Sequence, residues 1–160
     1  MLNIFKKKVK EVELVAPVNG KAVDLSEVPD KVFASGMMGE GIAFKYTGDT
    51  ICAPCDGKIT TIPNTMHAFG IIAENDAEIL VHIGIDTVNL KGEGFKKLVN
   101  EGDKVKAGDP IIKLDRSLIE SKGYNLITPV LITNSKDYSV EIQNIGDVNA
   151  GKSVIASVNK

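Results

Sequence analysis

The two histidines of the chain, His67 and His82, are the residues whose types and spacing most clearly suggest chemistry. They flank a stretch typical of a β-hairpin, because residues 70–81 form two apolar runs around a turn-forming Glu-Asn-Asp cluster. We predict a register in which His67 lies directly opposite His82, and Phe69 opposite Leu80. Opposed residues share a face of the sheet with Cβ atoms roughly 4.5–5.5 Å apart, so the two imidazoles would touch.

Two imidazoles in an apolar depression are suited to three kinds of chemistry. A metal site requires at least a third protein ligand, and the sequence shows none at a typical ligand spacing from the two histidines, so we expect no metal. A hydrolase wants a nucleophile motif such as Gly-x-Ser-x-Gly, which the sequence lacks. A neutral imidazole is also a good nucleophile towards phosphorus, and a second imidazole can hydrogen-bond the phosphoryl oxygens. The pattern alone leaves these uses open, beside histidines that only pack in the fold.

Two other motifs carry less chemistry. The pair in Cys52-Ala-Pro-Cys55 lies in a strand and turn, whereas a redox pair wants a βα junction and a zinc knuckle wants a second Cys or His pair. We therefore expect two small apolar residues there. The Gly-rich stretch 35–43 is not followed by Gly-Lys-Ser/Thr, which argues against a phosphate-binding P-loop. We expect no cofactor.

The elements that would position these side chains are short β-strands separated by Gly, Pro, Asn and Asp. Such spacing predicts an all-β protein, a compact antiparallel β-sandwich or barrel, rather than βαβ units. Short helical turns are expected at 94–100 and, after Asp115 as N-cap, at 116–122. The expected strands are 12–15, 20–25, 41–46, 50–53, 57–62, 70–73, 79–83, 104–105, 110–114, 126–132, 139–142 and 153–158.

One segment of the sequence is echoed 37 positions later. Val15-Ala-Pro-Val-Asn-Gly-Lys-Ala-Val23 resembles Cys52-Ala-Pro-Cys-Asp-Gly-Lys-Ile-Thr60. In each copy a strand ends at Ala-Pro, an Asn-Gly or Asp-Gly turn follows, and a second strand leaves through Lys. Two copies are too few for a solenoid, so we expect one hairpin type used twice within a single sandwich.

Length and composition bound the class of protein. A chain of 160 residues with 43% hydrophobic and 25% charged residues is typical of one globular domain, which we place at 11–160 after a short flexible segment at 1–10. A net charge of −2 gives no basic field and argues against nucleic acid as a partner. No apolar run reaches the roughly 20 residues of a membrane span, and no signal peptide is visible. We expect a cytoplasmic protein without stable membrane insertion.

Two blocks contain the histidines: His67-Ala-Phe69 and Val81-His-Ile-Gly-Ile-Asp-Thr-Val-Asn-Leu-Lys-Gly-Glu-Gly-Phe95. They closely resemble the glucose-type enzyme IIA (EIIA type 1) of the bacterial phosphoenolpyruvate:sugar phosphotransferase system. The resemblance covers essentially the whole chain after residue 10. It extends to Ala16-Pro17, Val28–Ala34, Gly39–Ala43, Ala53–Gly57, Glu101–Asp109 and Thr128-Pro129.

The resemblance implies a fold and a set of catalytic residues. The fold would be a duplicated hybrid motif similar to glucose permease IIA, and the protein would be a phosphotransferase that carries a phosphoryl group. His82 would be phosphorylated on Nε2, and His67 would stabilise the phosphoryl group and assist its onward transfer. Thr65 would orient His67. The carbonyl of Gly84 would accept the Nδ1–H of His82 and leave Nε2 free.

The same resemblance implies partners. The phosphocarrier protein HPr would donate the phosphoryl group, a cysteine on the enzyme IIB domain of a glucose-type sugar permease would accept it, and regulatory proteins would be further targets. We expect a monomer. An apolar rim around the histidines would exclude water and offer a docking face, and acidic residues would steer basic partners. The rim candidates are Val32, Phe33, Met37, Met38, Phe69 and Leu80, and the acidic candidates are Asp30 and Asp86.

Two functions of other classes are weighed against this one. The first is a non-enzymatic regulatory binding module, whose histidine pair serves only as a protein or zinc contact. Acceptance of a phosphoryl group from phospho-HPr discriminates between the two. The second is a swinging-arm carrier, because residues 99–112 look like a turn of biotinyl and lipoyl domains. The acceptor lysine turn of those domains is missing, which argues against it.

Overall fold

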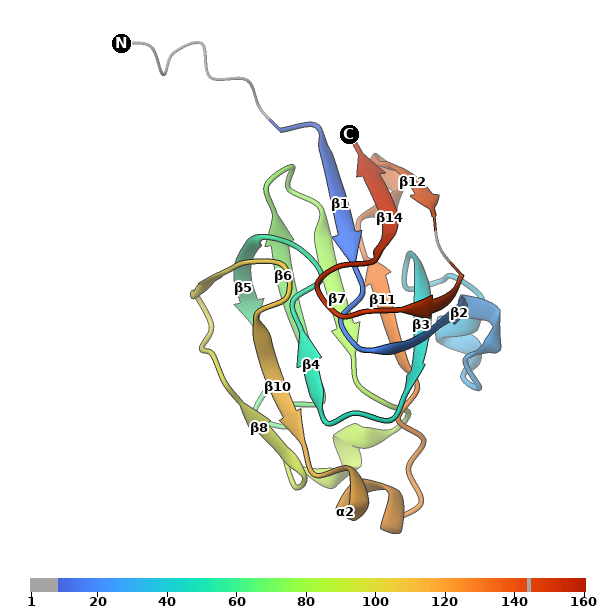
Figure 1. Cartoon of the computed structure of the whole chain (residues 1–160), viewed down its shortest axis with the longest axis vertical. Helices are drawn as coiled ribbons and strands as arrows, with labels where there is room; N and C mark the ends of the chain where they lie inside the picture. The colour runs from blue at the N-terminus through green and yellow to red at the C-terminus, as the bar shows by residue number, and fades with distance from the viewer. Residues whose placement is uncertain (1–8, 144) are drawn as a thin grey trace.

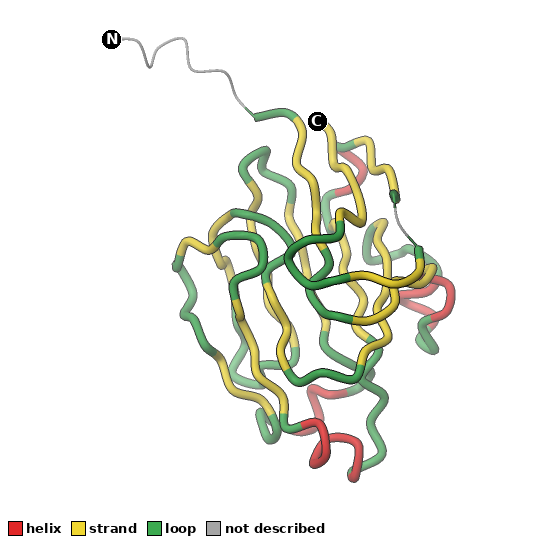
Figure 2. Tube along the Cα trace, viewed as in Figure 1, coloured by secondary structure: helices red, strands yellow, loops and turns green. Residues whose placement is uncertain are grey.

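The computed structural model describes residues 9–143 and 145–160. Within them every strand pairing is antiparallel, and the strands form one eight-stranded and two three-stranded sheets (Figure 1). The prediction of an all-β antiparallel sandwich is confirmed. Figure 2 shows the helical segments at the margins of the strands. The flexible segment expected at 1–10 lies, in its first eight residues, outside the described part of the chain.

The strands and helices are short. The strands are β1 (Glu11–Val15), β2 (Gly20–Asp24), β3 (Glu40–Tyr46), β4 (Thr50–Cys52), β5 (Gly57–Thr61), β6 (Ala68–Ala73), β7 (Glu78–His82), β8 (Phe95–Lys97), β9 (Lys104–Val105), β10 (Pro110–Leu114), β11 (Thr128–Ile132), β12 (Ser139–Ile142), β13 (Gly146–Val148) and β14 (Val154–Asn159). The helical segments are η2 (Leu25–Glu27), α1 (Lys31–Ala34), η3 (Thr87–Leu90), α2 (Arg116–Ser121) and η4 (Ser135–Asp137). None of the helices in the described ranges has the length and apolar character that a membrane crossing requires.

The expected strands are all present, with ends that differ by no more than two residues. The helix expected at 116–122 is confirmed as α2, and the Asp115 side chain accepts a hydrogen bond from the backbone N–H of Leu118. The helix expected at 94–100 is wrong, because Phe95 pairs with Leu114 and the segment forms β8 beside β10. Strand β13 and helix α1 were not expected.

The strand order divides the molecule into two halves of similar topology. The large sheet runs β13-β2-β3-β11-β7-β6-β5-β9, and the small sheets run β1-β14-β12 and β4-β10-β8. Replacing β1–β3 by β4–β6, and β11–β14 by β7–β10, turns each small sheet into the other and reverses the large one. We call β4–β10 the inner half and β1–β3 with β11–β14 the outer half. The inner half is continuous in the sequence.

The two echoed segments contact each other where the halves meet. The backbone N–H of Val15 donates to the carbonyl of Pro54 over 2.7 Å, and that of Cys52 donates to the carbonyl of Pro17 over 2.8 Å. Each bond is the counterpart of the other under the 37-residue shift. The prediction of one hairpin type used twice is wrong, because β1 pairs with β14 and β4 with β10, and the next strands, β2 and β5, belong to the large sheet. The echoed motif is a turn that leads from one sheet to another, and its two copies bind each other reciprocally.

A second pair of equivalent turns meets nearby. The Asp56 side chain accepts from the backbone N–H of Ala107, and the Asn19 side chain accepts in the same way from Ala150, each over 2.8 Å. The next residues, Gly108 and Gly151, both have positive φ, +90° and +73°. A Cβ atom on Gly151 would lie 3.0 Å from the Cα atom of Gly108, so the two turns pack backbone against backbone.

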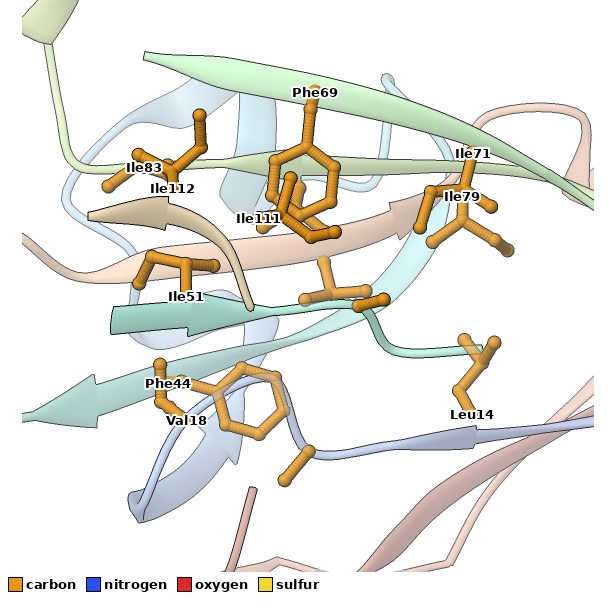
Figure 3. Packing of buried hydrophobic residues seen from close by; sticks show 14 of the residues in the cluster. Leu14, Val18, Phe44, Ile51, Phe69, Ile71, Ile79, Ile83, Ile111 and Ile112 are labelled. Atoms are coloured by element: carbon orange, nitrogen blue, oxygen red, sulfur yellow. The ribbon is translucent and has the colours of Figure 1, made fainter. Parts of the chain in front are cut away.

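The main core lies between the sheets, and a smaller one covers the opposite face of the large sheet. Figure 3 shows main-core side chains such as Phe69 and Ile79 directed towards those of β4 and β10. Residues alternate between the two faces along a strand. Ile79 and Val81 of β7 therefore join the main core, while Leu80 packs against the smaller one. That smaller core, which we call the outer cluster, contains Val23, Leu25, Val28, Phe33, Ala43, Ile127 and Leu131.

The two cysteines belong to the main core or its edge. Cys52 and Cys55 are both buried, and neither is in a disulfide within the described chain. Burial raises the pKa of the Cys55 thiol to about 12 and also raises the pKa of Cys52. Both thiols are neutral at pH 7, so the prediction of two small packed residues is confirmed.

Candidate functional site

The β6–β7 hairpin brings both histidines to one end of the large sheet. In its register Ala68 pairs with His82, and Phe69 pairs with Val81. The predicted register was therefore wrong by one residue. The turn is the cause: three residues, 74–76, connect the strands, and the last of them, Asp76, adopts a left-handed conformation with φ of 69°.

The predicted contact between the imidazoles is confirmed, although it forms differently. His67 precedes β6, and its carbonyl accepts a hydrogen bond of 2.7 Å from the backbone N–H of Ile83. Met66, with φ of 52°, turns the chain just before it. The two rings stand edge to face, with centroids 5.1 Å apart and an interplanar angle of 81° between His67 and His82.

The backbone after β7 sets the tautomer of His82. Its Nδ1 lies 2.9 Å from the carbonyl oxygen of Gly84. Because a carbonyl can only accept, Nδ1 carries the proton and the lone pair of a neutral ring is on Nε2. Gly84 has φ of +81°, and a Cβ atom there would lie 2.9 Å from the carbonyl oxygen of Asn125 and 2.7 Å from the side chain of Thr87. Only glycine fits this position without displacing its neighbours.

His67 has a different partner. Its Nδ1 lies 2.7 Å from the Oγ1 of Thr65. A hydroxyl can donate or accept, so Thr65 holds the ring of His67 in place without selecting its tautomer. The structure thus brings together the four residues predicted as catalytic: Thr65, His67, His82 and Gly84.

Both histidines are biased towards the neutral form. Burial lowers the pKa of His82 most, and the neighbouring His67 lowers it further. The hydrogen bond to Gly84 and the carboxylates of Asp30 and Asp86 raise the pKa of His82 but do not cancel these effects. Burial also lowers the pKa of His67. Neutral imidazole is the nucleophilic form, so the site is prepared for attack by Nε2 of His82 at pH 7.

Helix α1 covers one side of the His82 ring. The ring of Phe33 lies 4.7 Å from that of His82, centroid to centroid, at an angle of 49°. The helix begins at Asp30, whose carboxylate accepts a hydrogen bond of 2.9 Å from the backbone N–H of Val32. The sequence signal for this helix, which our prediction missed, is this N-cap before Lys-Val-Phe-Ala.

The predicted rim is only partly correct in composition. Val32 is 47% exposed, and Met37 and Met38 after α1 are 81% and 39% exposed. Phe69 is fully buried and so cannot contact a partner. It faces the main core because it pairs with Val81, a consequence of the one-residue change in register.

One exposed apolar residue close in sequence to Asp86 was omitted from the prediction. Val88, on η3 two residues after Asp86, is 46% exposed. Its signal was an apolar residue inside the polar run Asp-Thr-Val-Asn of the second histidine block. Leu80 is partly buried against the outer cluster on the His82 side of the sheet.

The described residues contain no group of three or more His, Cys, Asp and Glu side chains that could hold a metal ion. The pair itself offers few ligand atoms, because Nδ1 of His82 already donates to Gly84. The arrangement can instead present one nucleophilic nitrogen beside a second imidazole that donates or accepts a hydrogen bond. Both lie next to apolar and acidic side chains, and this suits group transfer between proteins.

Comparison with known proteins adds a family. Residues 12–138 match the family model described as phosphoenolpyruvate-dependent sugar phosphotransferase system, EIIA 1. The glucose-specific EIIA component of the PTS system of Oceanobacillus iheyensis is 46% identical over an alignment of 161 positions, and the alignment covers 98% of this chain and 97% of that protein. The glucoside-specific EIICBA component of Staphylococcus carnosus is 44% identical over 142 residues, which cover 89% of this chain but only 20% of that longer protein.

A solved structure has the same fold. The glucose permease IIA of Mycoplasma capricolum superposes with a TM-score of 0.84 at 35% sequence identity. The superposition covers 96% of this chain and 99% of that one. The similarity therefore extends over the whole sandwich and includes both halves.

Proposed function

Because the chain belongs to the EIIA 1 family of the phosphoenolpyruvate-dependent sugar phosphotransferase system, in which it is a phosphoryl carrier, we propose that Nε2 of His82 carries the phosphoryl group and that His67 assists its transfer. One observation carries this proposal. The Gly84 carbonyl holds the proton of His82 on Nδ1, so Nε2 has a free lone pair beside the ring of His67.

The transfer step needs no proton removal at the nucleophile. The lone pair of Nε2 attacks the phosphorus of a phosphohistidine on the donor, and the N–P bond of the donor breaks as the new N–P bond forms. His82 then carries the positive charge of a substituted imidazole, and the Gly84 carbonyl stabilises it through the Nδ1–H bond. Little covalent help is required, because phosphoryl transfer depends mainly on positioning and on charge stabilisation.

His67 has the position of a helper. Its ring stands edge to face against that of His82, with its own Nδ1 engaged by Thr65, so its Nε2 is the nitrogen left to contact a phosphoryl oxygen. A single imidazole binds that oxygen more weakly than an arginine fork would. The phosphoryl group therefore stays high enough in free energy to be passed on, as a relay requires.

Membership of the family implies the partners. The donor is the phosphocarrier HPr, and the acceptor is the cysteine of an enzyme IIB domain of a glucose-type permease. The exposed Val32, Met37, Met38 and Val88 give them an apolar docking surface. The carboxylates of Asp30 and Asp86, which act on the pKa of His82, attract a basic partner surface. The chain works in the cytoplasm as a monomer.

The test is a reconstituted relay of phosphoenolpyruvate, enzyme I and HPr, followed by intact-mass spectrometry. The wild-type chain is expected to gain one acid-labile phosphoryl group and His82→Ala to gain none. A His82→Ala protein that still takes up the group would overturn the assignment of the nucleophile.

A second pair of variants tests the helper. His67→Gln is expected to accept the phosphoryl group from HPr but to donate it to enzyme IIB at a much lower rate. Thr65→Val keeps the imidazole and removes only the hydroxyl, so its donation rate should fall between those of wild type and His67→Gln. Donation by His67→Gln at the wild-type rate would remove His67 from the mechanism.

A further inference from the structure

A second charged site lies at the edge of the large sheet, where β5 pairs with β9. Lys58 stands directly opposite Lys104, as Gly57 stands opposite Val105. The backbone N–H of Ile59 donates to the carbonyl of Asp103, so the hydrogen bonds of the ladder lie beside the Lys58–Lys104 pair and not within it. In such a non-hydrogen-bonded pair the two side chains lie closer together. Like charges directly opposite each other destabilise a sheet, so stability of the fold does not explain why two lysines occupy these positions.

The two lysines line a hollow. Its volume is about 440 Å³, within the usual range of small-molecule sites. Lys106 also lines it, and Ile72, which shares a face of the sheet with Lys58 and Lys104, adds apolar surface. The full lining is Asp56, Gly57, Lys58, Ile72, Ala73, Glu74, Lys104, Val105 and Lys106.

The three ammonium groups are not engaged in ion pairs. The ion pairs in the described residues involve other lysines, so Lys58, Lys104 and Lys106 have no carboxylate within 4.0 Å. Of the two acids in the lining, Asp56 already accepts from the backbone N–H of Ala107. With Glu74 as the second acid, three lysines and two carboxylates give the lining a net charge of +1, which is available to a bound anion.

The outer half contains the same corner with different charges. There β2 pairs with β13, and Gly20 stands opposite Val148 as Gly57 stands opposite Val105. The residue opposite Lys21 is Asp147, so this corner has opposite charges where the inner half has Lys58 and Lys104. The residue equivalent to Lys106 is Asn149. The lysine cluster is therefore a property of one corner and not a requirement of the repeated fold.

We propose that the Lys58–Lys104–Lys106 hollow binds a small organic phosphate. The ammonium groups act as point charges on the phosphate, and the side chain of Ile72, which lies on the same face of the sheet as Lys58 and Lys104, contacts the carbon part of the ligand. The site is separate from the histidine pair, because Ile72 pairs with Glu78 at the far end of β7 from His82. It does not depend on the proposed function of His82.

Phenyl phosphate is the probe, titrated into the whole chain labelled with ¹⁵N and followed by amide chemical shifts. Saturable shifts are expected at Gly57, Lys58 and Val105. Phenol, which lacks the charge, and inorganic phosphate, which lacks the carbon part, are expected to bind more weakly. Equal binding of phenol would overturn the role of the lysines, and equal binding of inorganic phosphate would overturn the organic part of the proposal.

The variants form a matched set. The double variant Lys58→Gln/Lys104→Gln is expected to weaken phenyl phosphate binding about tenfold or more, the effect of removing two charged contacts. Lys21→Gln removes the equivalent lysine of the other corner and should leave the affinity unchanged. Dispersed amide spectra of all variants verify folding. An unchanged affinity in the double variant, or an equal loss in Lys21→Gln, would contradict the proposal.

Discussion

The inner and outer halves of the sandwich share one topology but differ at the position of His82. His82 pairs with Ala68 on β6, and the equivalent pairing in the outer half joins Leu131 to Gly41 on β3. Leu131 is fully buried in the outer cluster, whereas His82 is partly exposed beside Phe33. The fold therefore accepts a leucine at this position, so the repeated topology does not itself require an imidazole there.

The connections before β3 and β6 explain how the halves diverged. In the outer half, the long connection from β2 to β3 contains η2 and α1, which cover the end of the sheet with Phe33 and expose Val32. In the inner half, the short connection from β5 to β6 contains Thr65 and His67. One connection supplies the apolar surround and the other supplies the second imidazole. The site is thus built from the differences between two similar units.

The largest expected effect is a loss of stability at Leu131, the outer-half equivalent of His82. Leu131→Ala should lower the free energy of unfolding by about 3 kcal/mol, since it removes a fully buried side chain and leaves a cavity. Chemical denaturation measures this loss. Below its own unfolding transition the variant should still accept a phosphoryl group from phospho-HPr.

His82→Leu is the reciprocal change, because it gives the inner half the residue found in the outer half. We expect the free energy of unfolding to stay within about 1 kcal/mol of wild type, as for a change that removes a desolvated imidazole and adds apolar contacts, while phosphoryl uptake is lost. A large destabilisation by His82→Leu, or none by Leu131→Ala, would show that the two positions do not differ in the way described.

An intermediate effect is expected where the halves are most alike. Gly108→Ala and Gly151→Ala should each cost about 1–2 kcal/mol, because each places a Cβ atom on left-handed backbone. The two methyl groups would also crowd each other across the contact between the turns. The double variant should therefore lose more stability than the two single losses added together, which a double-mutant cycle measures. Simple additivity would mean that the turns separate freely.

The smallest effect is expected from pH, and only the inner half contributes to it. Burial lowers the pKa of both histidines in the folded chain, so the unfolded chain binds more protons as the pH falls through about 6.5. The free energy of unfolding should decrease as the pH is lowered through that window, and it should level off once the histidines of the folded chain are also protonated. Denaturant midpoints in a pH series measure this slope. It should flatten in His67→Gln/His82→Gln, and an unchanged slope would assign it to other groups.

Much of the fold was predictable because turns and short apolar runs are local signals. The strand positions, helix α2 and the contact between the histidines all follow from residues close together in the sequence. The register of the β6–β7 hairpin was not predictable in this way. It depends on a left-handed conformation at Asp76, and a Glu-Asn-Asp cluster is compatible with turns of two or three residues.

Other errors arose where tertiary pairing overrides local pattern. The apolar spacing of Phe95, Leu98 and Val99 is typical of a helix, but β10 offers Phe95 a partner strand and the segment becomes β8. The burial of Phe69 followed from the same one-residue change in register that moved the pairing of His82. The predicted contact between the two imidazoles survived the error in register because the backbone before His67 turns and brings its ring back to that of His82.

The nesting of the inner half within the outer half sets the order in which a growing chain can form its sheets. All strands of the inner half lie between Thr50 and Leu114, so it can pair its strands while the C-terminal segment is still being synthesised. Within the described residues β1 pairs only with β14, which is synthesised more than 100 residues later. The unit that carries both histidines can thus assemble first, and β1 must wait until β14 has been synthesised to find its partner.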